Sequence, residues 1–163
     1  MNKTEYAWVR QTRGILFDFC GGLEPESLTR PLDGFGYASI RDMLVHTADC
    51  YRAWIGSFIL SKTNKPLTPK EDIPNISLDG IRAIFDQADA LVAELLGSPD
   101  SYMDEPIDKV IPWRTTGETL TITPRKLLMH TVTHEYHHKG QIVSMIRHLG
   151  YVPPNTDVLG TDD

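Results

Sequence analysis

Four segments of this chain repeat apolar residues at helical spacing, and they constrain the fold more than any other feature. They run over about residues 3–19, 40–61, 77–96 and 124–149, and connections rich in proline and glycine separate them. The stripe of the second segment, for example, consists of Met43, Thr47, Tyr51, Trp54 and Phe58. A helix with one apolar stripe buries that stripe against a neighbour. Four such helices in one small chain therefore predict an all-α four-helix bundle.

Residues that start and stop helices lie at the ends of these segments. Ser39 is the expected N-cap of the second segment, and Thr123, followed by proline, is that of the fourth. Gly21 is expected to end the first helix in a left-handed conformation, and Gly150 to end the last. Residues 108–123 alternate apolar and polar side chains around a glycine, so they predict a short β-hairpin before the last helix.

Length and composition narrow the class of protein. The 163 residues suit one domain, 1–163, with one core. The net charge is −6 and no stretch concentrates lysine and arginine, so we expect no nucleic-acid partner. The N-terminal stretch is polar, and no apolar run is long enough to span a bilayer, so we expect no membrane association. Cys20 and Cys50, without a secretory signal, fit a reducing, cytoplasmic environment.

Four of the six histidines lie in the stretch HTVTHEYHHKG, residues 130–140, inside the last helical segment. On a helical wheel, His134 lies at the edge of the apolar face and His138 inside it, whereas His130 and His137 lie on the flank. His134 and His138 are separated by about 6 Å along the helix axis, so both can reach one ion. The spacing of His130 and His134 permits the same pairing, but the wheel favours His134 with His138.

The inward pair of histidines predicts a metal site. A single inward histidine is more often a core residue with a satisfied hydrogen bond. Here Thr131 and Glu135 also lie on the inward arc, and burying so many polar groups without partners would cost about several kcal/mol. A divalent cation would use them, because imidazole is a favoured metal ligand.

A metal site needs a third ligand, and His46 is the one histidine outside the last segment. It borders the apolar stripe of the second segment, and two neighbouring helices can supply two ligands plus one. Cys50 follows one turn later and is either a fourth ligand or, as we favour, a small core residue. Three imidazoles, from His46, His134 and His138, would leave coordination positions open for water or substrate.

Two known metal motifs fit the histidine stretch less well. HEYHH matches the H-E-x-x-H of zincin proteases, but their next ligand lies downstream, where only His148 remains and faces the wrong way. Glu135 and His138 form the E-x-x-H of di-iron bundles, but the chain has no second copy. Glu135 is instead our candidate catalytic residue, which would take a proton or orient a ligand histidine. The alternative is a solvated flank carboxylate in a salt bridge.

Two stretches carry a family resemblance. TPRKLLMHTVTHEYHHKGQIVSMIRHLGYVPPNTD, residues 123–157, resembles the last helix of DinB/YfiT-like metalloproteins, with its His, a second His four residues on, and His-His-Lys/Arg-Gly-Gln. SIRDMLVHTADCYRAWI, residues 39–55, is similar to that family's second helix, which carries the third ligand. The resemblance extends over essentially the whole chain. It implies a four-helix bundle that holds a divalent metal through His46, His134 and His138. It also implies that the protein forms a homodimer.

The resemblance and the residues leave two classes of function open. The first is a metal-dependent enzyme acting on a small molecule, either a thiol-dependent S-transferase or isomerase with a low-molecular-weight thiol, or a hydrolase. Zinc or nickel is the expected ion, ahead of iron or manganese. The second is a non-catalytic, dimeric metal- or ligand-binding module. An exchangeable position beside Glu135 favours the enzyme, and a closed shell with Cys50 as fourth ligand favours the module.

Overall fold

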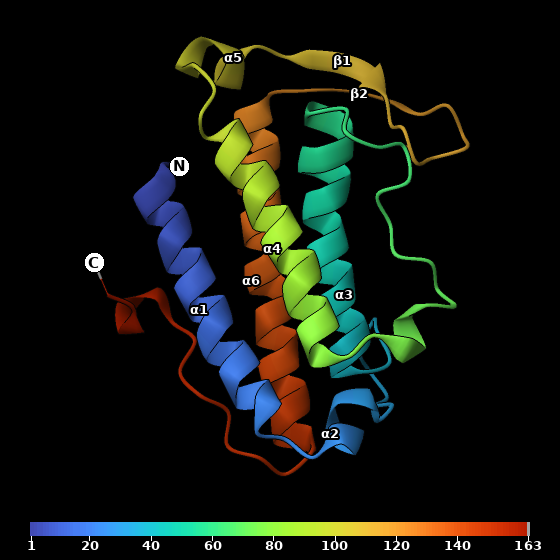
Figure 1. The fold of residues 1–163 in the computed structure, drawn as a ribbon, viewed down its shortest axis with the longest axis vertical. Coiled ribbons are helices and arrows are strands. Elements are labelled where there is room, and N and C mark those ends of the chain that lie inside the picture. The colour runs from blue at the N-terminus through green and yellow to red at the C-terminus, as the bar shows by residue number, and fades with distance from the viewer. Residues whose placement is uncertain (163) are drawn as a thin grey trace.

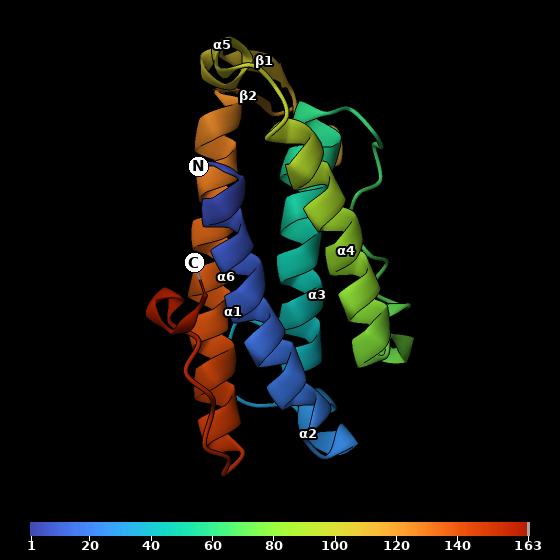
Figure 2. The same ribbon diagram turned by 60° about the vertical axis from the view of Figure 1, so that its left-hand side comes forward.

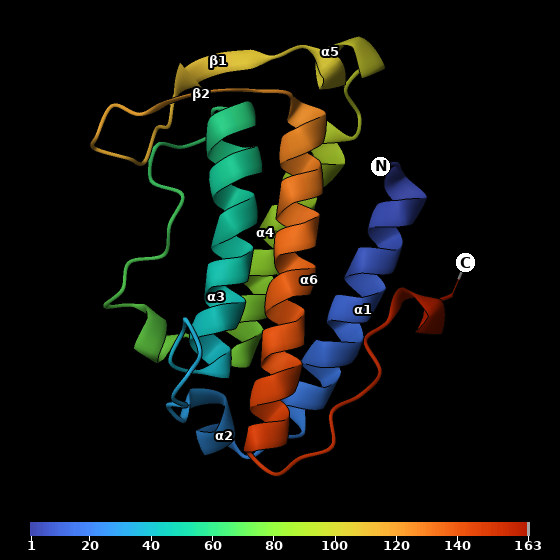
Figure 3. The same cartoon turned by 180° about the vertical axis from the view of Figure 1, so that it is seen from behind.

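A computed structural model describes residues 1–162 and confirms the four-helix bundle. The four long helices lie side by side in all three views (Figures 1, 2 and 3). They are α1 (Lys3–Gly21), α3 (Ile40–Tyr51) with its continuation η1 (Arg52–Ile59), α4 (Leu78–Leu95) and α6 (Pro124–His148). α3 and α6 run in opposite directions, so a step toward the end of one is a step toward the start of the other (Figure 1).

Short elements cover the ends of the bundle. The predicted hairpin is confirmed: β1 (Ile107–Val110) pairs antiparallel with β2 (Thr119–Ile122) and lies with α5 (Asp100–Asp104) at one end (Figure 1). α2 (Pro25–Thr29) lies at the opposite end. Two single turns, η2 (Ile73–Asn75) and η3 (Val158–Gly160), complete the set, and the C-terminal segment with η3 returns to α1.

The helix ends follow the expected capping residues, with one exception. Ser39 accepts a hydrogen bond from the Asp42 N–H at 3.2 Å, and Gly150 takes a left-handed φ of 90° after α6. The expectation of a left-handed Gly21 is wrong. α1 continues through Gly21, and Gly22 caps it at a φ of −91°, with its N–H donating to the Phe19 carbonyl at 3.0 Å. The ordinary right-handed turn satisfies the last carbonyls, so no positive φ is needed.

The second long helix widens from α to π after Tyr51. The Leu60 N–H donates to the carbonyl of Ile55, five residues back, at 3.0 Å. This part of the helix packs closely on α4, because a Cβ added at Gly56 would lie 2.8 Å from Leu91 Cδ1. π-helical turns are rare and occur often at functional sites. Here the π-helical segment follows the part of α3 that carries His46 and Cys50, two residues of interest for the candidate site.

Buried apolar side chains from the four long helices form the core. Among those fully buried are Leu16, Met43, Tyr51, Phe58, Ile81, Leu95, Leu128 and Met145. The buried positions of α6 include most of the apolar face expected from the helical wheel and extend beyond it to Val132 and Lys139. Among the described residues, no helix is both long enough and apolar enough to cross a membrane.

Candidate metal centre

Three histidines from two helices converge between α3 and α6. His46 Nε2 lies 3.0 Å from His134 Nε2, and His138 Nε2 lies 3.1 Å from the same atom. One ring nitrogen from each of the three lies within 4.8 Å of the others. Two nitrogens bound at about 2.1 Å to one ion are roughly 2.9–3.4 Å apart in octahedral or tetrahedral geometry. The donor set therefore fits a single divalent ion.

Gln141 fixes the orientation of the most buried of the three rings. His138 Nδ1 lies 2.6 Å from Gln141 Oε1, one turn further along α6. With the amide oxygen as acceptor, Nδ1 carries the proton and Nε2 keeps its lone pair free. A metal-binding histidine commonly donates its second N–H in this way, which sets its tautomer.

Tyr37 covers one side of the histidine group. Its ring stacks on His46, with centroids 4.2 Å apart and planes 24° apart, and meets His138 edge-on at 5.8 Å. Tyr37 precedes α3 in a loop, and the sequence reasoning missed it. Its contacts come from the path of the loop, and the local pattern contains no signal for them.

The three histidines are held in the neutral form that metals bind. Burial first, and then His138, lower the pKa of His46 to about 4. Burial and the other histidines, with His138 the largest of them, lower the pKa of His134 to about 4. Burial also lowers the pKa of His138. At neutral pH none of these rings has to lose a proton before it coordinates an ion.

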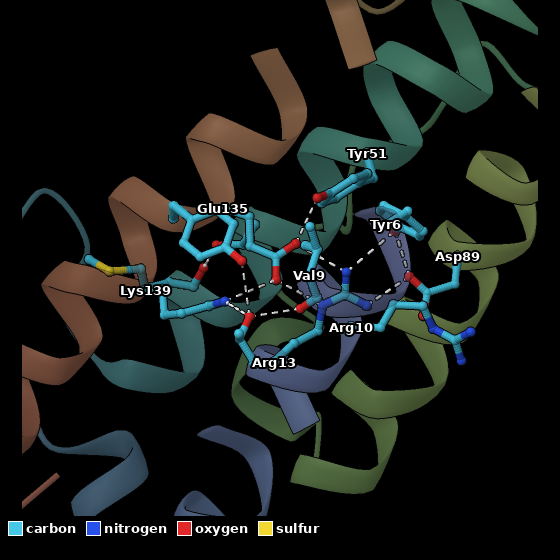
Figure 4. Close-up of polar contacts among 12 residues, drawn as sticks. Tyr6, Val9, Arg10, Arg13, Tyr51, Asp89, Glu135 and Lys139 are labelled. Atoms are coloured by element: carbon cyan, nitrogen blue, oxygen red, sulfur yellow. Dashed lines mark hydrogen bonds and ion pairs between the residues drawn. The ribbon is translucent and has the colours of Figure 1, made fainter. Parts of the chain in front are cut away.

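Glu135 follows His134 directly but points into a buried polar network in the core (Figure 4). Arg13 donates to both of its oxygens, from Nε at 2.9 Å and Nη2 at 3.0 Å, and the Tyr51 hydroxyl donates at 2.7 Å. The residue is 2% exposed, so the salt bridge is present but the solvated flank alternative is wrong. Burial alone would raise the pKa of Glu135, but Arg13, Lys139 and Tyr51 outweigh it and lower the pKa.

The network joins all four long helices. Arg13 of α1 also donates to Asp89 of α4 at 2.7 Å, and the Tyr6 hydroxyl donates to the same carboxylate oxygen at 2.7 Å (Figure 4). Glu135 comes from α6 and Tyr51 from α3. The sequence alone placed Glu135 on the inward arc but did not identify Arg13 as its partner. An arginine within the apolar stripe of the first segment was the one available signal. Whether Glu135 takes part in catalysis stays a prediction.

Cys50 and His130 do not join the three-histidine group. Together with His134 they form a second set of metal donors. One ligand atom each from Cys50, His130 and His134 lies within 4.8 Å of the others. Cys50 is therefore not grouped with His46 and His138 in one four-ligand shell. It is 7% exposed, and burial, Glu135 and Asp49 raise the pKa of its thiol to about 12. His137 is exposed on the flank of α6, as the helical wheel predicted.

Two solved structures resemble this chain in fold. TT2238, described as a four-helix bundle protein, has a TM-score of 0.57 at 19% identity and covers 85% of this chain and 95% of its own. The DinB-like protein YjoA from Bacillus subtilis has a TM-score of 0.63 at 15% identity, covering 93% of this chain and 97% of its own. At these identities the likeness shows the fold alone.

Sequence comparison identifies the family. YizA from Bacillus subtilis (strain 168) is 26% identical over 160 residues, which cover 96% of this chain and 91% of that protein. The profile of the DinB family matches residues 1–163. A match over the whole chain, together with the four-helix bundle and the three-histidine group between α3 and α6, places the chain in a family: it belongs to the DinB family.

Proposed function

We propose that this protein is a metal-dependent enzyme that binds one divalent ion per chain through His46, His134 and His138. The observation that carries the proposal is the convergence of their ring nitrogens, at 3.0 and 3.1 Å, from two different helices. Borderline ions that favour imidazole suit this donor set, with zinc or nickel ahead of iron or manganese. Three protein ligands leave coordination positions for a small molecule, as catalytic rather than structural sites do.

The chain's own residues prepare the site for a substrate. Gln141 holds the His138 ring, and Tyr37 shields one face of His46. His46 and His134 are only partly buried, which supports access from solvent. A divalent ion held there by His46, His134 and His138 would lower the pKa of a water or thiol and would stabilise the resulting anion.

A thiol is our preferred co-substrate. The DinB/YfiT-like proteins that this chain resembles include S-transferases and an isomerase that use low-molecular-weight thiols. With water in place of the thiol, the same site would perform a hydrolysis. A non-catalytic metal-binding module is the second candidate. The Cys50 thiol, grouped with His130 and His134, favours it as a further metal donor beside the three histidines.

Metal analysis of purified variants tests the ligand set. We expect about one ion per chain in the wild type and in His137→Ala, and loss of the ion in His46→Ala, His134→Ala and His138→Ala. His137 is a matched control, because it neighbours His138 on α6 but points to solvent. Equal loss from His134→Ala and His137→Ala, or loss from neither, would contradict the assignment.

Cobalt substitution tests which small molecule the site uses. In a Cys50→Ser background, which removes the nearby thiol, cobalt held by three histidines should show no intense near-ultraviolet sulfur charge-transfer band. A small thiol should produce that band if the protein is a thiol-using enzyme. If no thiol produces it while the bound cobalt still exchanges a water, the hydrolase is favoured. A cobalt shell that accepts neither ligand would favour the non-catalytic module.

A further inference from the structure

A second set of metal donors lies one helical turn away from the three histidines. It consists of Cys50 on α3, with His130 and His134 on α6, and one ligand atom from each lies within 4.8 Å of the others. We propose that this set is a second site, which shares His134 with the first, for a thiophilic ion such as cadmium or cuprous copper. A thiolate with two imidazoles is a donor set that such ions prefer to oxygen ligands.

The antiparallel packing of α3 and α6 explains why the second set exists. Cys50 follows His46 by four residues, one turn toward the end of α3. α6 runs the other way (Figure 3). The facing pair therefore moves one turn toward the start of α6, from His134 and His138 to His130 and His134. The interface therefore presents the same arrangement twice, a pair four residues apart on α6 facing one donor on α3.

The surroundings of the second set suit a site reached from the surface. His130 is exposed, whereas Cys50 is 7% exposed and not in a disulfide. The Trp54 ring, from the π-helical turn η1, meets His130 edge-on at 5.9 Å, and Trp113 packs on Trp54 at 5.0 Å. These indoles form an apolar wall beside the donors. On binding, the S–H bond of Cys50 breaks, the sulfur bonds to the ion and the proton leaves to solvent.

His134 belongs to both sets, so the two sites are coupled. Its ring centroid lies 5.5 Å from that of His130 and 4.3 Å from that of His138. An ion that takes His134 into the Cys50 set removes one ligand from the three-histidine set. This coupling rests on the proposed function, but the Cys50 site itself does not.

Cadmium titration of the metal-free, full-length protein tests the proposal. We expect a thiolate-to-cadmium charge-transfer band in the ultraviolet that saturates near one equivalent, and no band in Cys50→Ser or Cys50→Ala. Cys20→Ser is the matched control, since Cys20 is also a buried free cysteine, and it should keep the band. His46→Ala removes a ligand of the three-histidine set but none of the Cys50 set, so it should keep the cadmium band. Failure of the proposed three-histidine site can therefore be told apart from failure of the Cys50 site.

Two histidine variants decide whether Cys50 acts within a site. His130 is exposed, so His130→Ala should fold normally, as circular dichroism would show. Its cadmium affinity should fall by more than the roughly 10–100-fold typical of changes outside the ligand shell. His134→Ala should lose both the band and the zinc. No band in the wild type, a band that survives in the Cys50 variants, or unchanged cadmium affinity in His130→Ala would overturn the proposal.

Discussion

His134 and Glu135 are adjacent in sequence but point to different neighbours of α6. The His134 imidazole faces His46 across the α3–α6 interface, whereas the Glu135 carboxylate meets Arg13 and Tyr51 in the core. Successive residues on a helix point about 100° apart, so neighbours in a motif need not share a site. The H-E-x-x-H reading fails here for this reason, since its glutamate is bound on the core side, away from the histidine group.

Loss of the Glu135 carboxylate should destabilise the fold strongly. In Glu135→Ala the Arg13 guanidinium, 5% exposed, keeps Asp89 but loses its bidentate partner. Removing one partner of a buried ion pair costs about 3–5 kcal/mol. We expect a loss of this size in the free energy of unfolding of Glu135→Ala, measured by urea denaturation. Glu118→Ala is the control, because its pair with Arg114 is exposed, and it should cost about 0–1 kcal/mol. Similar losses for both variants would contradict the view of a buried network.

Removing the partner of His138 should weaken metal binding without abolishing it. Gln141→Ala frees the His138 ring to rotate and to change its tautomer. We expect the zinc affinity, measured by competition with a chromogenic chelator, to fall about 10–100-fold. Gln87→Ala, an exposed glutamine on α4, should leave the affinity unchanged. If Gln141→Ala binds zinc as tightly as the wild type, Gln141 has no role in orienting the ring.

At the level of elements, the α3–α6 interface combines the candidate metal centre with part of the polar network. His46 faces His134 on one side of the contact, and the Tyr51 hydroxyl donates to Glu135 on the other. The Tyr51–Glu135 hydrogen bond and the Arg13 contact hold α6 against two helices at once. The network thus supports the spacing between His46 and the histidines of α6, although it contains none of them.

This interface should make the metal-free protein sensitive to acid. An unfolded histidine has a pKa near 6.5, whereas burial and neighbouring histidines lower the pKa of His46 and His134 to about 4. Between these values the unfolded chain binds more protons than the folded one, so stability falls as the pH falls through about 6.5 to 4. The melting temperature of metal-free protein should be lower at pH 5 than at pH 7.

A pair of variants links the acid sensitivity to the interface. His46→Gln removes one of the depressed groups, so its melting temperature should change less between pH 7 and pH 5. His137→Gln alters the exposed flank of α6 and should retain the pH dependence of the wild type. A pH dependence that is the same in His46→Gln as in the wild type would show that other groups cause it.

At the scale of the whole molecule, the bundle leaves several large apolar side chains on its surface. The most exposed are Leu67, Val110, Met129, Val152 and Leu159. Most soluble oligomers are symmetric homo-oligomers, and two-fold dimers are the commonest. The homodimer implied by the family resemblance remains a proposal. Sedimentation equilibrium should give twice the 18.4 kDa chain mass, and a single chain mass at all concentrations would contradict it.

The amino-acid sequence by itself determined the four long helices, most of their ends, the hairpin and the inward arc of α6. The reason is that these features depend on local chemistry. Apolar periodicity selects the helix, and Ser39, Thr123 and Gly150 satisfy or terminate its backbone hydrogen bonds within a few residues. His134 and His138 could be placed on one side of a helix because 3.6 residues per turn sets their angle, whatever packs against them.

Only the tertiary structure decided which side chains meet across helices. The sequence could not say that His46 faces His134 while Cys50 faces the next turn, that Arg13 reaches Glu135, or that Tyr37 covers His46. These contacts depend on how far one helix slides along its neighbour and how it rotates, which is set by packing of the whole core. A shift of one turn would exchange the two donor sets while leaving every helical wheel unchanged.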